Sequence, residues 1–374
     1  MLGPVGVDVR KAGDTGVGRY VEGLLEGLAR QCCPPALVLY GRSWDRSLRT
    51  YAEARRTLYT VRSGVYSPWQ HLEFWRLLHR HSPPVFHAPH FTTPLVIPRP
   101  TKLLVTIHDV AFLQRPDLTP YEYRQPWRLL AYGLALKIAA FRADLILADT
   151  QAAARQIVRQ LPDAGGKVRV LNPGVDLQRL APSGRADPIS AGGPQDTLLF
   201  VGTITARKGV HELLEAFART QARRKGTHLV LVGQNRSAYA RQAIQRARQL
   251  DIARQVIFAG PLPDKQLMMC YRRARAVVEP SHLEGFGFPV VEAMAAGIPC
   301  VASAIGPLQE VTDGAALLVP PGDVPALTDA VDQVCFDAGL SQELSKKGRE
   351  RAAHFSLERM GEAAMAIYRE AMEL

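Results

Sequence analysis

The chain has 374 residues, of which 47% are hydrophobic and 22% charged, as in an ordinary globular protein. This length predicts about two domains at roughly 150 residues each. The formal net charge is +11, which suits either general solubility or attraction to an anionic ligand, an anionic membrane surface or nucleic acid. Because no tail-like run of Lys and Arg occurs, a nucleic-acid partner is not expected.

The five cysteines form no CxxC pair, and no His/Cys spacing is typical of a zinc site. This pattern predicts a reducing environment without structural metal. No apolar run reaches ~18 residues, and the first residues lack the basic and apolar regions of a secretory signal. We therefore expect a cytoplasmic protein, either free or peripheral on the inner face of the cytoplasmic membrane.

Short apolar runs alternate along the chain with amphipathic segments of helix length. Because these runs are continuous, they predict parallel strands that are buried on both faces. Strands are expected at 5–9, 36–39, 85–88, 103–107, 145–148 and 168–171, and then at 198–201, 229–232, 256–259, 276–278, 300–302 and 316–319. The alternation with helices is typical of βαβ units, so we predict an α/β fold with two parallel sheets.

The composition changes near residues 181–196, where Gly, Pro, Ala and Ser flank a polar stretch. Such a stretch is typical of an interdomain linker. We therefore predict a first domain at 1–180 and a second domain at 181–355. Apolar residues recur at helical spacing in 356–374, which predicts a terminal helix that packs back on the first domain.

A glycine-rich loop at 13–20 follows the first predicted strand, and a helical pattern continues from Val21. Ligands bind at the carboxyl ends of strands in open α/β sheets, and a glycine loop entering a helix offers amides to a phosphate. Gly16 and Val17 are therefore candidate substrate-binding residues. The GxxGxG spacing is not the GxGxxG of dinucleotide binding, which disfavours a dehydrogenase. Taken alone, the loop is explained better by a plain tight turn.

His108 and Asp109 follow another predicted strand. A histidine beside an acid at the carboxyl end of a strand is placed to touch a ligand. We predict that both contact the substrate, although a buried, hydrogen-bonded core pair is the simpler explanation of these two residues alone.

The turn that opens the second predicted domain contains Gly202 and the adjacent cations Arg207 and Lys208. Arg can pair with phosphate oxygens through two hydrogen bonds, and Lys adds a point charge. Two cations beside a diphosphate also stabilise a departing nucleotide, which is needed if no metal does so. These residues are a candidate diphosphate site, with a solvated basic turn as the alternative.

The most specific motif lies at 279–299, where seven residues separate Glu284 from Glu292. Pro289 suits the first turn of a helix and Gly297 its C-terminal end, so the loop between the two acids can present amides at a helix N-terminus. Carboxylates accept hydrogen bonds from neighbouring hydroxyls, which ribose and hexose both display. We therefore predict that the two acids face one pocket from two depths and bind a sugar-containing ligand.

Together these motifs resemble family 4 of the retaining glycosyltransferases, a large GT-B family typified by bacterial mannosyltransferases. The resemblance covers nearly the whole chain, with motifs in order at 16–20, 108–109, 148–150, 172–176, 201–209, 231–233, 284–292 and 306–311. It implies a GT-B fold, in which two Rossmann-like domains face each other across a cleft. It also implies transfer of a hexosyl group with retention of configuration.

The resemblance implies four catalytic residues. His108 would contact the transferred sugar near its primary hydroxyl, Arg207 and Lys208 would bind the diphosphate, and Glu284 would hold sugar hydroxyls. One departure is Thr203, which stands where many relatives carry an arginine after Val-Gly. A mannosyltransferase-like branch with a Val-Gly-Thr and Arg-Lys pattern resembles this chain better, so the diphosphate assignment depends on Arg207 reaching the phosphate.

The substrate-binding residues implied in the same way are Gly16, Val17, Asp109, Gly202, Phe286, Gly287, Phe288, Glu292 and Glu310. Among them, the amides of Phe286 and Gly287 would assist in holding the sugar, Glu292 would bind the ribose hydroxyls and Glu310 would border the nucleotide. No DxD-type acid pair ends a predicted strand. We therefore expect no metal and no cofactor, with a nucleotide diphosphate sugar as co-substrate.

The sequence says less about the donor, the acceptor and other partners than it says about the fold. The family branch favours GDP-mannose as donor, with a UDP-hexose as alternative, and a glycan or lipid-linked acceptor in cell-surface polysaccharide or glycolipid synthesis. Aromatic and cationic residues gather at 67–80 and 121–142. Core packing explains them most simply, and an anionic lipid carrier at a membrane surface is the alternative. A sugar-nucleotide epimerase and a non-catalytic nucleotide-sugar binder also remain open.

Overall fold

The computed structural model describes residues 3–14, 16–41, 56–119, 125–180 and 196–374. The described residues of 1–114, 125–176 and 355–374 form one compact unit, and those of 115–124 and 177–354 form another. Thr15, residues 121–124 and almost all of the expected linker at 181–196 lie outside the described residues. Within the described part of the chain, no helix combines the length and apolar character needed to cross a membrane.

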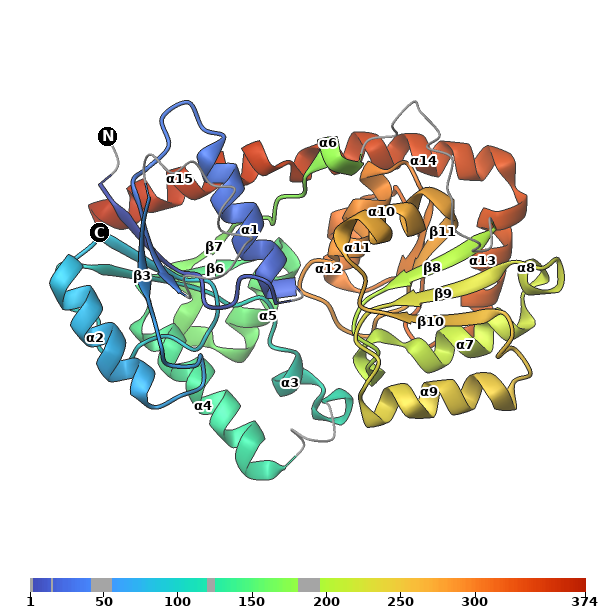
Figure 1. Cartoon of the computed structure of the whole chain (residues 1–374), viewed down its shortest axis with the longest axis horizontal. Helices are drawn as coiled ribbons and strands as arrows, with labels where there is room; N and C mark the ends of the chain where they lie inside the picture. The colour runs from blue at the N-terminus through green and yellow to red at the C-terminus, as the bar shows by residue number, and fades with distance from the viewer. Residues whose placement is uncertain (1–2, 15, 42–55, 120–124, 181–195) are drawn as a thin grey trace. The chain divides into compact units, whose positions relative to one another are not determined.

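The first unit is built on a seven-stranded parallel sheet (Figure 1). Its elements are β1 (Val5–Asp8), α1 (Gly16–Ala29), β2 (Leu37–Gly41), β3 (Arg56–Thr60), α2 (Trp69–His81), β4 (Val85–Ala88), β5 (Lys102–Thr106), α3 (Ala111–Gln114), α4 (Pro126–Arg142), β6 (Leu145–Ala148), α5 (Gln151–Gln160), β7 (Val168–Val170) and α15 (Leu357–Glu373). The strand order is β3-β2-β1-β4-β5-β6-β7. In register, Val5 of β1 pairs with Leu37 on one side and Val85 on the other.

Helices α2, α4 and α5 contribute to one core cluster of the first unit, through residues such as Phe74, Leu136 and Ile157. Helix α15, at the C-terminus of the chain, runs beside α1 (Figure 1). The backbones of these two helices approach closely at Gly27 and Gly361, where a Cβ on either residue would collide with the other helix. The sequence therefore permits this contact only because both positions are glycine.

A buried hydrogen-bond chain also ties α15 to the sheet. Tyr368 bonds to Nδ1 of His87 at 2.8 Å, and Nε2 of His87 bonds to Thr106 at 2.8 Å. Thr106 in turn bonds to Tyr20 of α1 at 3.1 Å. Burial lowers the pKa of His87 to about 3, so this imidazole is neutral at physiological pH.

The second unit contains a six-stranded parallel sheet in the order β10-β9-β8-β11-β12-β13 (Figure 1). Its elements are α6 (Leu177–Leu180), β8 (Thr197–Val201), the 3-10 turn η6 (Ala206–Lys208), α7 (Val210–Arg219), α8 (Gln221–Arg224), β9 (His228–Val232), α9 (Ala238–Gln249), β10 (Val256–Gly260), α10 (Asp264–Arg273), β11 (Ala274–Glu279), α11 (Phe288–Ala295), β12 (Cys300–Ser303), α12 (Gly306–Thr312), β13 (Leu317–Val319), α13 (Val324–Phe336) and α14 (Ala338–Ala352). Phe200, Leu231 and Val278 lie in its core cluster.

Every strand predicted from the sequence is present, with ends shifted by no more than two residues. Two expectations were wrong. Strand β3 was not predicted, because it is an edge strand without the continuous apolar run of the central strands. Helix α1 begins at Gly16 rather than at Val21, so the second half of the glycine loop is the first turn of the helix.

Both sheets share the Rossmann strand order. In this order the second and third strands are added on one side of the first strand, and the later strands are added on its other side, so the direction of addition reverses beside the first strand. The reversal points lie between β1 and β4 in the first unit, and between β8 and β11 in the second. Ligands of open α/β sheets bind at the carboxyl ends of the strands at such points. The loops after these four strands are therefore where a site is expected.

Candidate functional site

A buried group of charged residues occupies the β8/β11 reversal point of the second unit. We call Lys208, Glu279, Ser281 and Glu284 the Lys208 cluster. The Nζ atom of Lys208 lies 2.5 Å from Oε1 of Glu284 and 3.3 Å from Oε1 of Glu279. The hydroxyl of Ser281 donates a hydrogen bond to Oε1 of Glu279. All four side chains are buried, so a charged group here exchanges most of its water for these contacts.

The local backbone brings these residues together from two loops. The amide of His282 donates to the carbonyl of Arg207 at 2.8 Å, which joins the loop after β11 to the turn after β8. A Cβ on Gly202 would lie 3.3 Å from Cε of Lys208. Glycine at 202 therefore makes room for the lysine side chain, which is a role that the sequence did not reveal.

The charges of the Lys208 cluster influence one another strongly. Burial opposes the charged form of Lys208, but Glu279 and then Glu284 outweigh it and raise the pKa of the ammonium. Burial would raise the pKa of Glu284, whereas Lys208 and then Arg207 hold it below its usual value. At Glu279 burial prevails and raises the pKa. The arrangement favours a charged lysine paired with an ionised Glu284.

The Lys208 cluster retains capacity to bind an anion. An ammonium group carries three N–H donors, and the two carboxyl contacts account for two of them. Arg207 is half-buried beside the cluster and acts electrostatically on both Lys208 and Glu284. Arg207 and Lys208 occupy adjacent positions of one turn, and the binding of a diphosphate by these two cations stays a prediction.

Helix α11 begins directly after the loop that carries Glu284. Gly287 precedes the helix with φ +99°, in the left-handed region that favours glycine, and Pro289 stands in the first turn. Glu292, inside the helix, is buried and accepts a hydrogen bond of 2.7 Å from the hydroxyl of Tyr271. Tyr271 comes from α10, and no spacing signal in the sequence connected it to Glu292.

The other predicted residues of the second unit surround this helix or lie near it in sequence. Phe286 is buried and Phe288 half-buried, and their rings meet edge to face at 5.2 Å. Glu310 lies on α12, where its backbone carbonyl accepts a hydrogen bond of 2.7 Å from Arg351. The phenylalanines therefore shape the loop before α11 through packing.

In the first unit, the predicted glycine loop leads into α1. Gly16 is exposed and Val17 half-buried at the start of this helix. A Cβ on Gly16 would meet no atom within 4 Å. Packing therefore does not require glycine at this position, whereas the close approach of a ligand to the helix N-terminus would.

His108 follows β5 and pairs with an acid that the sequence did not single out as a site residue. Its Nδ1 lies 2.9 Å from a carboxylate oxygen of Asp149, and its Nε2 lies 3.1 Å from the carbonyl oxygen of Pro89. Both partners only accept hydrogen bonds, so the ring is satisfied when both nitrogens are protonated. Burial opposes that charge, but the Asp149 carboxylate outweighs it and raises the pKa of His108.

Asp109 does not supply the carboxylate that the His108 ring meets. It is half-buried, and its backbone carbonyl accepts a long hydrogen bond of 3.5 Å from Tyr132. The edge of the Tyr20 ring packs on His108 with ring centres 4.8 Å apart. Asp149 and Pro89 thus orient the His108 ring at the carboxyl end of β5, and 18% of its side chain remains exposed.

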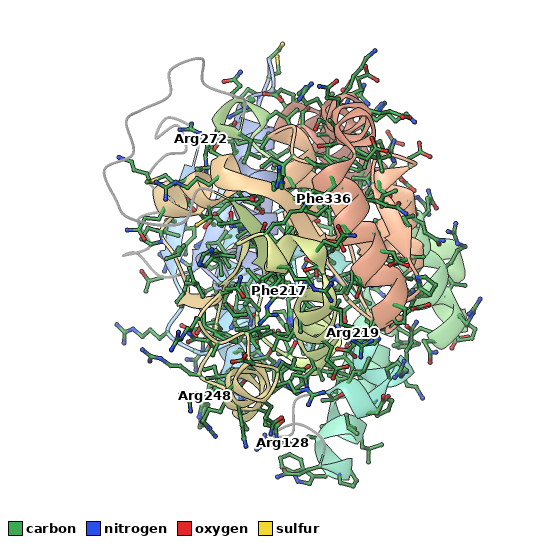
Figure 2. The ribbon with its side chains drawn as sticks, turned by 90° about the vertical axis from the view of Figure 1, so that its right-hand side faces the viewer. Arg128, Phe217, Arg219, Arg248, Arg272 and Phe336 are labelled. Carbon is green, nitrogen blue, oxygen red and sulfur yellow. The ribbon has the colours of Figure 1, made fainter. Side chains whose placement is uncertain are left out.

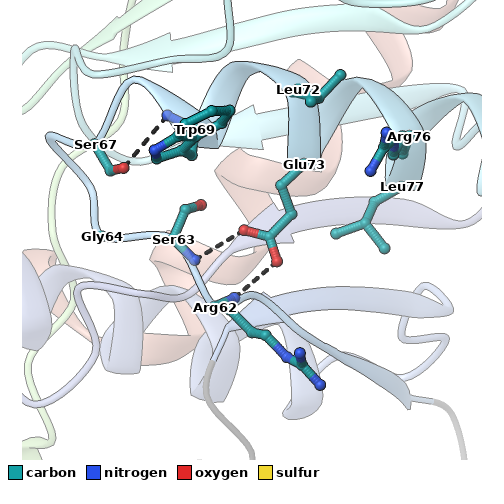
Figure 3. A pocket seen from close by; sticks show the side chains of 9 residues that line it. All are labelled: Arg62, Ser63, Gly64, Ser67, Trp69, Leu72, Glu73, Arg76 and Leu77. Atoms are coloured by element: carbon teal, nitrogen blue, oxygen red, sulfur yellow. Dashed lines mark hydrogen bonds between the residues drawn. The ribbon is translucent and has the colours of Figure 1, made fainter.

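An open groove of about 610 Å³ lies between the loop after β3 and helix α2 of the first unit (Figure 3). Its lining residues are Arg62, Ser63, Gly64, Ser67, Trp69, Leu72, Glu73, Arg76 and Leu77. Glu73 accepts hydrogen bonds of 2.8 Å from the backbone amides of Arg62 and Ser63, which fixes the loop on the helix. The groove lies on the aromatic and cationic segment 67–80 that the sequence analysis singled out.

The described residues contain no cluster of three or more His, Cys, Asp or Glu side chains with the geometry to hold a metal ion.

Comparison with protein families matches both halves of the chain. The family "Glycosyltransferase Family 4" matches residues 15–179, and the family "Glycosyl transferases group 1" matches residues 188–351. A protein of Saccharomonospora viridis named D-inositol 3-phosphate glycosyltransferase is 34% identical over 282 residues. That match covers 72% of this chain and 65% of the relative, a little under two thirds of its length. The protein of the same name from Actinosynnema mirum is 32% identical, with 73% and 67% covered.

Solved structures resemble the whole chain in fold. Sucrose-phosphate synthase from Thermosynechococcus elongatus superposes with a TM-score of 0.79 at 23% identity, covering 98% of both chains. HepE from Anabaena, solved in complex with UDP-glucose, gives a TM-score of 0.76 at 17% identity and covers 98% of this chain and 100% of that one. At these identities the likeness concerns the two-domain, Rossmann-like GT-B fold.

Proposed function

Since this chain belongs to glycosyltransferase family 4, we propose that it transfers a hexosyl group, with retention, from a nucleotide diphosphate sugar to an acceptor hydroxyl. The observation that carries the proposal is the Lys208 cluster. It provides a charged, buried lysine beside Arg207 at the reversal point of the second sheet, where this fold class binds ligands.

The proposed reaction breaks the bond between the anomeric carbon and the β-phosphate oxygen. The bonding electrons leave with that oxygen, and Arg207 and Lys208 stabilise the negative charge that develops on it. The acceptor oxygen attacks from the face that the nucleotide leaves, and its proton passes to the departing phosphate oxygen. Because Glu279 and Glu284 raise the pKa of Lys208, the ammonium is charged at neutral pH.

The acids have separate proposed roles in binding. A carboxylate can accept about four hydrogen bonds, so Glu284 can pair with Lys208 and still hold sugar hydroxyls. Glu292 is proposed to bind the ribose hydroxyls, with its carboxylate oriented by Tyr271. Phe286, Gly287, Phe288 and Glu310 are proposed to complete the binding of the sugar and the nucleotide.

For the first unit, we propose that the N-terminus of α1 at Gly16 and Val17 meets phosphate. Gly16 supports this because it is exposed and has open space where a side chain would stand. His108 is proposed to contact the transferred sugar, with Asp149 holding the imidazolium in orientation, and Asp109 to border the same ligand.

The proposed donor is GDP-mannose, as the resemblance of the sequence implies. A UDP-hexose is the second candidate, because HepE, which shares the fold, was solved with UDP-glucose. The proposed acceptor is a glycan or lipid-linked hydroxyl in the synthesis of surface polysaccharide or glycolipid, at the cytoplasmic face of the membrane. The name of the relatives adds inositol 3-phosphate to the acceptors to be assayed.

A thermal-shift panel of nucleotides and nucleotide sugars tests the donor, because a ligand of the native state raises Tm by mass action. One donor is expected to raise Tm more than the others and then to be consumed with an acceptor, or hydrolysed slowly without one. Binding without any turnover would instead support a non-catalytic nucleotide-sugar binder. Formation of an isomeric nucleotide sugar without acceptor would support an epimerase.

A further inference from the structure

Helix α4 of the first unit exposes a row of large apolar side chains. Trp127 is 63% exposed, Leu130 74%, Leu134 56% and Phe141 80%. We call these four residues the α4 stripe. At about 100° of rotation per residue, their positions fall within a sector of roughly 60° on the helix surface. The row is therefore one narrow face and extends along nearly the whole helix.

The opposite face of α4 accounts for its packing on the sheet. Its buried residues are Leu136, Ala139 and Ala140, two of which are alanine. The four large apolar side chains of the α4 stripe thus point away from the core, whereas the apolar face of an ordinary surface helix points toward it. Exposed apolar residues that are scattered singly over a surface need no partner, whereas the α4 stripe is a continuous row, which is typical of an interaction surface.

The charged residues of α4 all have one sign. Arg128, Lys137 and Arg142 are its charged residues, and the helix contains no Asp or Glu. By the same helical rotation, Lys137 falls on one side of the stripe, and Arg128 and Arg142 fall on the other. Arg128 points outward at the end of α4, 5.0 Å from the centre of the Trp127 ring (Figure 2).

We propose that the α4 stripe docks this protein on the surface of an anionic phospholipid bilayer. An apolar stripe with aromatic residues near both ends and cations on both sides matches a helix that lies in the plane of a membrane interface. The cations would meet anionic headgroups, in keeping with the chain's net charge of +11. A second copy packed symmetrically on the stripe would instead bring rows of like charge together.

This docking goes beyond the proposed glycosyl transfer, because it requires neither donor nor acceptor. The test is flotation of the full chain with vesicles of neutral phosphatidylcholine, or of the same lipid with about 30% phosphatidylglycerol. The chain is expected to float with the anionic vesicles and to bind the neutral vesicles at least about tenfold more weakly.

The variant Leu130→Ser/Phe141→Ser removes apolar surface without touching the core. It is expected to lose anionic-vesicle binding by about tenfold or more, while its Tm and its donor-induced thermal shift match the wild type. The matched control is Trp69→Ser on α2, since Trp69 is 73% exposed in the same unit. This control is expected to float like the wild type.

Three results would overturn the proposal. The first is a wild-type chain that stays in solution with anionic vesicles. The second is a Leu130→Ser/Phe141→Ser variant that floats normally, or a Trp69→Ser control that loses binding as strongly. The third is a concentration-dependent dimer that the α4 substitutions dissociate without any lipid binding, since the stripe would then be an interface between copies. The donor-induced thermal shift is read separately, so a failure of docking does not count against glycosyl transfer.

Discussion

Replacing Lys208 with alanine tests the Lys208 cluster most directly. The substitution removes the cation that pairs with both Glu279 and Glu284, which are 0% and 9% exposed. Breaking a buried ion pair by removing one partner costs about 3–5 kcal/mol, because the remaining charge loses its compensation. For a unit of this size, about 2–4 °C of Tm is lost per kcal/mol, so the expected decrease is roughly 6–20 °C.

The decrease in Tm should depend on pH with a defined sign. Without Lys208, burial and mutual repulsion raise the pKa values of the two carboxyl groups in the folded protein above their unfolded values. The folded variant then binds more protons than the unfolded chain, and its stability falls as pH rises through the folded pKa values. The deficit relative to wild type should therefore be smaller at about pH 5 than at about pH 8.

Turnover separates the structural role of Lys208 from the catalytic one. Measured well below the Tm of the variant, the rate should fall by about 100-fold or more, the usual effect of removing one group that stabilises developing charge. Glu279→Gln in the Lys208→Ala background should restore part of the Tm but not the rate. Lys265→Ala, an exposed lysine on α10, is the control. A near-normal rate would remove Lys208 from the mechanism, and an unchanged, pH-independent Tm would refute the electrostatic reasoning.

Two further predictions concern substrate binding, and a third concerns metal dependence. Gly16→Ala should leave Tm unchanged or slightly raised, since alanine favours a helix over glycine by about 0.5–1 kcal/mol. The same variant should bind the donor more weakly. The control Gly166→Ala, whose glycine also has open space around it, should bind the donor normally. Tyr271→Phe removes the hydroxyl that donates to Glu292 and should raise KM for the donor by up to about tenfold with little change in kcat; an unchanged KM would contradict the ribose role. Activity in EDTA should equal activity with added divalent metal, and metal dependence would contradict the proposed leaving-group chemistry.

The positions of the strands could be predicted because parallel strands buried on both faces require continuous apolar runs. Strand β3 was not predicted because it is an edge strand with a neighbour on only one side, and its Arg56–Thr60 sequence contains only the short apolar pair Leu58 and Tyr59. The exposure of one apolar face of α4 was not predicted from the sequence for another reason. Its residues satisfy the composition of a core helix, and only the packing of Leu136 against the sheet reveals which face is exposed.

Some residues of the candidate site could be predicted from local sequence motifs, whereas others depend on contacts between distant parts of the chain. Arg207, Lys208 and Glu284 could be named because local motifs carry them, and the structure joins Lys208 to Glu284. Glu279 and Asp149 could not be assigned their roles, because each acts through a contact made only when separate strands lie side by side in the sheet. Glu279 changes the chemistry of the cluster, since a second buried carboxyl group raises the pKa of Lys208 and must itself tolerate burial. The motif thus identifies the residues that we propose to bind a phosphate, whereas a contact between neighbouring strand ends sets the protonation state of Lys208.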